Sequence, residues 1–387
     1  MMISTKKIVM VPGPVPVSSS VLRTLADETL SHTDPNFTAA FQSLLADLRA
    51  MLHCDGVAFV IAGSGTMGME MAAANVISKE DKVLLCTNGF FGDRYISICE
   101  KRGYNLDVMR AQWGRSITAD EVDKALAEGG HSVLIMTHVE TSTGAMIQLE
   151  EIAKMLREKH PEVIFIVDGV AACGGAMVDM TWGIDIYFSC SQKALGCVPG
   201  MALLWANNRA LAKREAIGAI PESYVDFDRW VPVMRDTKKY WGTPAVNSIQ
   251  ALKEAVRLVK EEGYETRCKR HADDAALIAA SMEAIGFKTA CEGEFRAPTL
   301  SVFLYPADMT VGDAEFRDAI FKEGGLVAGC LGDFAGKGFR MGHMANLDKH
   351  MLLCYVGAVE RACLRCGMKT APGAALAVMQ KGLAARD

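Results

Sequence analysis

The sequence is short of the features that mark several protein classes. Its 41 lysine and arginine residues against 46 acidic ones give a net charge of −5, without the basic excess of a nucleic-acid-binding protein. No stretch of 18 residues is free of polar interruption, so no membrane helix is expected. Aromatic residues make up only 7% of the chain, and half of the residues are hydrophobic. We therefore expect an α/β enzyme with neither nucleic acid nor a membrane as partner.

Cysteine is neither dense nor patterned. Twelve cysteines in 387 residues do not suggest a disulfide framework, and Cys86, Cys190 and Cys354 lie in apolar runs where buried thiols are expected. Cys363 and Cys366 have C-x-x-C spacing without a second pair, so packing is favoured over a zinc site. The N-terminus lacks the apolar core of a secretion signal. These features predict a reducing, cytoplasmic location and no metal.

Strand and helix patterns alternate through the first two thirds of the chain. This alternation predicts a mostly parallel sheet covered by helices on both faces. The predicted strands are 57–62, 82–86, 132–137, 164–168, 184–189 and 201–206. The predicted helices are 36–52, 67–76, 93–102 and 149–159.

Composition and pattern divide the chain into three segments. Residues 1–20 carry Pro12, Pro14 and Pro16 and read as an extended arm. Residues 21–250 hold the strand–helix alternation, and 251–387 form a smaller α+β domain. Its predicted elements are helices 246–263, 265–285, 311–322 and 348–366 and strand 300–305. The tail after Pro372 is rich in alanine and is expected to be a weak helix or frayed.

Lys193 and Asp168 carry the strongest chemical signal. Asp168 ends one predicted strand, and Lys193 follows another by a few residues. Both therefore lie at the same edge of a parallel sheet. A lysine can hold an aldehyde as a Schiff base, and a carboxylate can keep a ring nitrogen protonated so that the ring accepts electrons. Pyridoxal phosphate has both groups, and we expect it as the cofactor.

A glycine motif at 63–68 fits G-x-G-x-x-G between a strand and a helix. A dinucleotide site is one interpretation, and an NAD-dependent oxidoreductase would follow from it. The next strand, however, ends without an acid that could bind a ribose hydroxyl. A single phosphate needs only the free amides of a helix N-terminus. Phosphate binding is favoured, and a purely structural turn stays open.

Three further segments supply candidate site residues. In the NGFFG segment (88–92) Phe91 is expected to stack on a planar ring and Phe90 to lie in the core. The hydroxyl-rich loop 137–144 can bond a phenolic oxygen or simply cap a helix. Arg340, between apolar neighbours, suits a substrate carboxylate or a structural ion pair. His138 and His343 are expected to be buried structural histidines.

Together these segments resemble the class V aminotransferases of the fold-type-I pyridoxal-phosphate enzymes. The likeness is greatest to the alanine/serine–glyoxylate aminotransferases, with 2-aminoethylphosphonate–pyruvate aminotransferases as near relatives. It implies a large domain with a mostly parallel sheet and a smaller C-terminal α+β domain. The matching segments are 12–14, 63–66, 88–92, 137–144, 167–171, 183–193, 240–244 and 339–343.

The resemblance also implies roles and a reaction. Lys193 would be the Schiff-base lysine and Asp168 the partner of the pyridine nitrogen. Arg340 would bind the substrate α-carboxylate, and Thr141 would lie near the ring oxygen. The residues expected to hold the phosphate are Ser64, Gly65, Thr66 and Gln192, joined by Tyr240 and Thr243 from the neighbouring subunit of a homodimer. The implied reaction moves an amino group from alanine or serine to glyoxylate or pyruvate by a ping-pong mechanism.

Alternatives within and outside this chemistry remain. The glyoxylate enzymes carry tryptophan where Phe91 stands, so the reaction type is better indicated than the substrate. A cysteine desulfurase shares the fold, and Cys330 lies in the segment that carries its nucleophile. Gln192 stands where such enzymes have histidine, which disfavours this reading. A third interpretation is a pyridoxal-phosphate fold that binds without catalysing, although it need not keep Asp168, Lys193 and Arg340.

Overall fold

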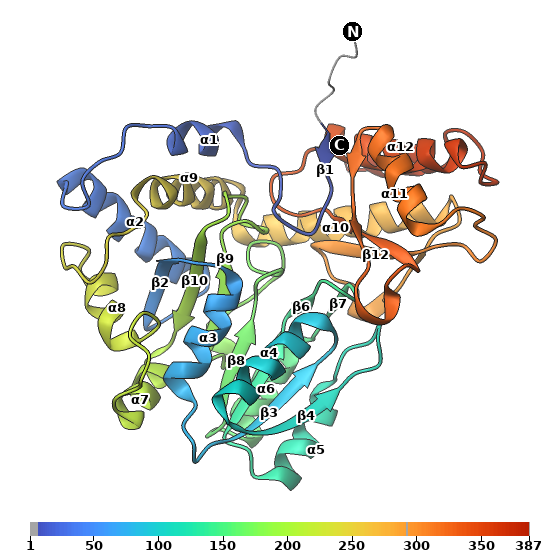
Figure 1. The fold of residues 1–387 in the computed structure, drawn as a ribbon. Helices are drawn as coiled ribbons and strands as arrows, with labels where there is room; N and C mark the ends of the chain where they lie inside the picture. Colours follow the sequence, from blue (N-terminus) through green and yellow to red (C-terminus); the bar gives the residue numbers. More distant parts are fainter. Residues whose placement is uncertain (1–6, 292, 387) are drawn as a thin grey trace.

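A seven-stranded sheet forms the centre of the larger part of the molecule in the computed structural model, which describes residues 7–291 and 293–386 (Figure 1). Strand β10 is antiparallel to both of its neighbours, and the remaining ladders are parallel. The predicted mostly parallel sheet is thus confirmed. In sheet order the strands are β2 (Val57–Ala62), β10 (Met201–Ala206), β9 (Ile186–Cys190), β8 (Ile164–Asp168), β5 (Val133–Thr137), β3 (Lys82–Thr87) and β4 (Asn105–Arg110).

Burial along the strands shows that helices cover both faces of this sheet. Every residue of β5, β8, β9 and β10 is buried, and such strands must be apolar on both sides. Edge strand β4 has no buried residue. The helices of this part are α2 (Pro35–Met51), α3 (Gly65–Val76), α4 (Phe90–Arg102), α5 (Ala119–Gly129), α6 (Leu149–Lys159), α7 (Asn208–Ile217), α8 (Phe227–Arg235) and α9 (Val246–Glu262).

The smaller part has its own antiparallel sheet and hydrophobic core. Its strands are β11 (Lys288–Thr289), β12 (Leu300–Leu304), β15 (Gly338–Gly342) and β14 (Ala328–Gly329), in sheet order. The helices around it are α10 (Tyr264–Glu283), α11 (Asp313–Lys322), α12 (Lys349–Arg365) and α13 (Ala374–Ala384). The predicted α+β character is confirmed. Helix α9 crosses the predicted boundary at 250/251, and the exact division into domains stays a prediction.

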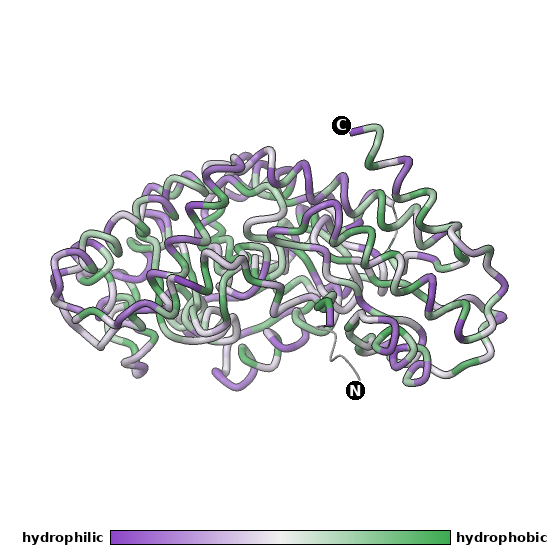
Figure 2. The backbone as a smooth tube through the Cα atoms, turned by 90° about the horizontal axis from the view of Figure 1, so that it is seen from above, coloured by the Kyte–Doolittle hydropathy of each residue, from purple (hydrophilic) through white to green (hydrophobic). Residues whose placement is uncertain are grey.

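The N-terminal segment connects the two parts. Strand β1 (Ile8–Val9) pairs in parallel with β13 (Gly325–Leu326) of the smaller part, and helix α1 (Ser19–Leu25) packs on α9 of the larger part. Between them, Pro12 and Gly13 pass directly beside Lys193. Seen from above, the molecule is elongated, and the C-terminal end of the chain projects from it (Figure 2).

Some expectations about single residues and the tail are corrected. Phe90 is 38% exposed rather than part of the core, and Cys354 is exposed although it lies in an apolar run. The tail forms helix α13, which packs on α10 and α12 and is not frayed. His138 and His343 are buried as expected. Of the helices in the described part of the chain, none has the length and apolarity needed to cross a membrane.

Candidate active site

A cavity of about 200 Å³ lies where five strands of the main sheet end. Residues that follow β2, β3, β5, β8 and β9 line it, because the carboxyl ends of parallel strands meet at one edge of a sheet. Eight of the predicted site residues come together here. They are Ser64, Gly65, Thr66, Phe91, Thr141, Asp168, Gln192 and Lys193.

Lys193 lies at the wall nearest the N-terminal segment. Its Nζ donates a hydrogen bond to the Pro12 carbonyl oxygen. Burial lowers the pKa of Lys193, and the nearby Arg340 lowers it further. A neutral amine is the form that attacks an aldehyde, so both effects favour Schiff-base chemistry. Gly13 has a φ of +94°, a conformation that favours glycine, and a Cβ there would lie 2.5 Å from Lys193 Cδ, so the lysine side chain would have to shift.

Asp168 lies on the cavity wall at the end of β8. Its side chain is buried, and Oδ1 accepts a hydrogen bond of 2.9 Å from the amide of Val170. Burial raises the pKa of Asp168 to about 7, and the charge of Glu140 acts in the same direction. A cationic ring nitrogen placed against this carboxylate would favour its ionised form. Asp168 therefore suits a partner that arrives with a positive charge.

The start of helix α3 presents backbone amides that no side-chain cap engages. Ser64 is the N-cap residue, and its side chain makes no capping hydrogen bond to the first amides of the helix. Such amides, together with the helix dipole, attract an anion. Across the cavity, Gln192 Oε1 is buried without a hydrogen-bond partner in the described structure. An anion bound at the helix start would accept hydrogen bonds from amides there, whereas Gln192 Oε1 is itself an acceptor and needs a donor.

Phe91 faces the cavity from the first turn of α4. The Arg94 guanidinium lies 4.8 Å from the centroid of the Phe91 ring, and its Nη1 is 3.4 Å from Thr66 Oγ1. Arg94 lines the cavity but was not predicted from the sequence. Its spacing of one helical turn after Phe90 was the available signal, since both side chains then share a helix face. Arg94 places a cation beside the anion-binding end of the cavity.

Arg340 lies next to the cavity, in the middle of β15. Its Nε donates to the Gly329 carbonyl oxygen at 2.8 Å, and its Nη1 lies 3.4 Å from the Thr141 carbonyl oxygen. Among the described residues it forms no ion pair with a carboxylate. A structural ion pair is therefore wrong for Arg340, and its guanidinium keeps donors free for an incoming anion.

Tyr240 and Thr243 do not reach the cavity of their own chain. Tyr240 is 62% exposed, and its hydroxyl lies 3.2 Å from Thr243 Oγ1. The resemblance assigns both residues to the site of a neighbouring subunit, and this assignment stays a prediction.

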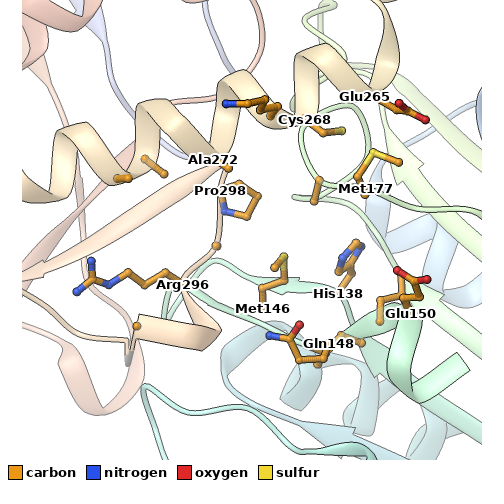
Figure 3. Close-up of a pocket in the computed structure, with 18 of the residues that line it drawn as sticks. His138, Met146, Gln148, Glu150, Met177, Glu265, Cys268, Ala272, Arg296 and Pro298 are labelled. Carbon is orange, nitrogen blue, oxygen red and sulfur yellow. The ribbon is translucent and has the colours of Figure 1, made fainter. Parts of the chain in front are cut away.

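A larger pocket of about 750 Å³ lies elsewhere, between α10 and the start of α6 (Figure 3). His138 and Met146 face it from one side, and Cys268 and Ala272 from α10 on the other. Its size does not make it the reaction site, because it lacks both Lys193 and Asp168.

Burial lowers the pKa of His138 to about 3, which leaves the ring neutral. The described residues contain no group of three or more potential metal ligands.

Fold and cavity together define a fold-type-I pyridoxal-phosphate enzyme. Residues 19–308 match the family model described as aminotransferase class-V, and the chain belongs to this family. It is an aminotransferase, and pyridoxal phosphate is its expected cofactor. The dinucleotide interpretation of the 63–68 motif and the non-catalytic interpretation are therefore wrong.

The similarity to known proteins covers nearly the whole chain. The sequence is 30% identical to an L-aspartate–glyoxylate aminotransferase from Paracoccus denitrificans, covering 96% of this chain and 95% of that one. The fold is similar to the crystal structure of ureidoglycine–glyoxylate aminotransferase from Bacillus subtilis, with a TM-score of 0.92, 29% identity and 99% of each chain covered. It is also similar to alanine–glyoxylate aminotransferase from Nostoc sp., with a TM-score of 0.87, 30% identity, and 94% and 96% covered.

Proposed function

We propose that this aminotransferase moves an amino group from a small amino acid, alanine or serine, to a small 2-oxo acid, glyoxylate or pyruvate. The observation that carries the proposal is that Lys193 and Asp168 line one cavity. Arg340, a cation without a carboxylate partner in the described structure, lies beside it. These are the groups needed to hold the cofactor at two ends and to bind a substrate carboxylate.

The residues around the cavity would divide the work as follows. When bound, pyridoxal phosphate supplies a sink for the electron pair left when the substrate loses its α-proton. Lys193 would hold the group through its aldehyde carbon and, once the substrate amine replaces it, would move the α-proton with the freed Nζ. Asp168 would keep the ring nitrogen protonated. Donor and acceptor would use the same site in turn, which gives ping-pong kinetics.

Phe91, Thr141 and Arg340 would orient the reactants. Phe91 would cover one face of the ring, and Thr141 would lie near its phenolic oxygen. Arg340 would bind the carboxylate that amino acid and oxo acid share. The amides after Ser64, with Thr66 and Gln192, would bind the phosphate.

The substrate assignment has support on the acceptor side. The three named relatives differ in their amino donors, but glyoxylate appears in each of their names. Of the two arginines at the cavity, Arg94 lies beside Thr66 at the proposed phosphate end, which leaves Arg340 for one substrate carboxylate and favours a monocarboxylic donor over aspartate. A 2-aminoethylphosphonate–pyruvate aminotransferase is the alternative within this chemistry. A desulfurase is disfavoured because burial raises the pKa of Cys330 to about 12, whereas a nucleophilic cysteine must ionise.

We also propose a homodimer with shared active sites, in which Tyr240 and Thr243 reach the phosphate of the neighbouring subunit. The exposure of Tyr240 supports this arrangement, since the ring lies on the surface of its own chain. A cytoplasmic location is proposed on the free thiol state of the cysteines.

Borohydride reduction tests the cofactor assignment directly. Protein saturated with pyridoxal phosphate is reduced and digested, and mass spectrometry should find the cofactor on the peptide that contains Lys193. The variant Lys193→Ala should lose both the adduct and turnover, and the matched variant Lys269→Ala, at an exposed lysine, should keep both. An unmodified Lys193 peptide from saturated wild-type protein would overturn the proposal.

A second experiment identifies the substrates. Turnover is measured with alanine, serine and 2-aminoethylphosphonate as amino donors, each with glyoxylate or pyruvate as acceptor.

A further inference from the structure

Glu140 is a buried carboxylate at the junction of the loops around the cavity. It ends the short strand β6 (Val139–Glu140) and has no exposed surface. Its Oε2 accepts hydrogen bonds from the amides of Phe91 at 2.8 Å and Gly92 at 3.2 Å, and its Oε1 accepts from the amide of Ser142 at 2.8 Å. One carboxylate thus holds two chain segments that lie about 50 residues apart in the sequence.

The segment at the start of α4 and the 140–144 loop are in close contact. Ser142 Oγ accepts a hydrogen bond of 2.9 Å from the Phe90 amide, beside the bonds made by Glu140. A Cβ on Gly89 would lie 2.3 Å from Ser142 Oγ and 2.7 Å from Glu140 Cγ, so the turn before α4 depends on a bare backbone. The start of α4 and the 140–144 loop are therefore joined as one hydrogen-bonded unit.

Two residues on this unit, Phe91 and Thr141, line the cavity. The Phe91 amide donates a hydrogen bond to the Glu140 carboxylate, and Thr141 is the next residue after Glu140 in the chain. Arg340 Nη1 lies 3.4 Å from the Thr141 carbonyl oxygen. A continuous series of contacts therefore runs from the guanidinium through the loop and the carboxylate to the aromatic ring.

We propose that Glu140 is a positioning residue that fixes the Phe91 ring relative to Thr141 and Arg340. The proposal rests on the proposed function, because it assigns the ring of Phe91 to the cofactor face. Glu140 would not touch cofactor or substrate itself. It would set the distance between the stacking ring and the carboxylate-binding arginine.

Only an ionised carboxylate satisfies all three amides. Both of its oxygens accept, whereas a glutamine side chain offers one acceptor and one donor group. In Glu140→Gln the NH2 group would face either the Phe91 and Gly92 amides or the Ser142 amide. One side of the contact would then be lost with little change in volume. Burial raises the pKa of Glu140, and the amides act in the opposite direction by binding the ionised form.

Glu360 provides a matched control in the smaller part of the molecule. It is also buried, and its carboxylate accepts hydrogen bonds from the amides of Gly373, Ala375 and Leu376 at the start of α13. Glu360→Gln therefore removes the same kind of contact by the same change, but in α12, away from the cavity. Both variants should lose stability, and Glu140→Gln should in addition affect the cavity.

Hydrogen exchange and cofactor spectroscopy separate positioning from stability. In protein without cofactor, exchange measured by mass spectrometry should accelerate at 88–92 in Glu140→Gln and at 373–376 in Glu360→Gln. With pyridoxal phosphate bound, only Glu140→Gln should change the visible circular dichroism of the cofactor and weaken its binding about tenfold. Its kcat should fall about 10- to 100-fold, the range expected when a reacting group is misplaced.

The outcomes distinguish the two proposals. If wild-type protein binds no pyridoxal phosphate, the proposed function fails, whatever the exchange data show. If wild-type protein is active and Glu140→Gln matches Glu360→Gln in cofactor dichroism, cofactor affinity and kcat, the positioning role is overturned. Should Glu140→Gln not fold, Ser142→Ala removes only the acceptor of the Phe90 amide. A smaller change of the same sign in the dichroism supports positioning, and an unchanged spectrum contradicts it.

Discussion

Arg340 combines partial burial with a charge that no carboxylate balances among the described residues. In the described structure its guanidinium donates to the carbonyl oxygens of Gly329 and Thr141. Burial lowers the pKa of Arg340 because it destabilises the charged guanidinium. An anion bound beside it would stabilise that charge. A carboxylate matches the planar fork of the guanidinium through two parallel hydrogen bonds, which the point charge of lysine cannot reproduce.

We therefore expect Arg340→Lys to lower kcat/KM for the amino donor about 10- to 100-fold, the loss that corresponds to one charged hydrogen bond. This loss should come mainly from a higher KM. The absorbance of the bound cofactor should stay unchanged. Arg317→Lys is the matched control, because Arg317 also lies against Gly329 but is already paired with Asp313. Steady-state kinetics of both variants check the prediction, and equal effects of the two would contradict it.

Asp168 makes the stability of the cofactor-free protein depend on pH. Its folded-state pKa of about 7 lies above the ordinary 3.8, so the folded state binds more protons between these values. Stability must then fall as pH rises through this window, by an upper bound on the order of 4 kcal/mol. Asp168→Asn removes the contribution. From pH 5 to pH 8, wild-type protein without cofactor should lose thermal stability relative to the variant, and a constant difference between them would contradict the assignment.

At the scale of elements, helix α13 shows how a weak local pattern can become ordered. Its segment has no side-chain N-cap, but the Glu360 carboxylate accepts from its first amides, and Ala375 and Met379 are buried against the smaller core. A distant residue therefore supplies the cap that the local sequence lacks.

Met379→Ala should lower the free energy of unfolding by about 2–5 kcal/mol, because it removes a fully buried side chain and leaves a cavity. Gln380→Ala, at the exposed neighbour, should change it little. Denaturant titration of both variants measures the difference. If the two variants unfold at the same denaturant concentration, the tail does not pack as described.

Sequence patterns predicted the apolar elements well and the polar ones poorly. The predicted bounds of β2, α6, β8 and β10 agree with the structure, since each has a continuous or regular apolar pattern. Strand β4 was missed because it lies at the sheet edge with polar residues along both faces. Helix α8 was missed because Pro232 lies within it.

The same distinction applies to the candidate site. Residues at the end of a strand, such as Asp168, could be placed at one edge of the sheet from the chain alone. Glu140 could not be recognised, because its importance comes from partners on other segments, whereas the helical spacing of Arg94 was a signal left unused. The lack of a carboxylate partner for Arg340 likewise became visible only with the fold, since it depends on every neighbouring segment at once.

At the scale of the whole molecule, two residues predicted to bind the phosphate do not reach the cavity of their own chain. Among the described residues, neither Tyr240 nor Thr243 lines the cavity, and the Tyr240 hydroxyl lies 3.2 Å from Thr243 Oγ1. Other large apolar side chains are also exposed, among them Leu22, Phe90 and Tyr224. Phe90 adjoins the cavity residue Phe91. In the proposed homodimer, the partner would bring its own Tyr240 towards the phosphate end.

Mixed dimers test whether Tyr240 acts on the neighbouring subunit. Lys193→Ala and Tyr240→Ala each damage both sites of a symmetric dimer. If Tyr240 acts across the interface, a mixed dimer has one site with both defects and one site with none. Random reassociation after co-denaturation should then restore about one quarter of wild-type activity, because half of the dimers are mixed and each holds one intact site. Subunits that supply their own Tyr240 would instead leave the mixture at the average of the two variants, and the shared site would be disproved.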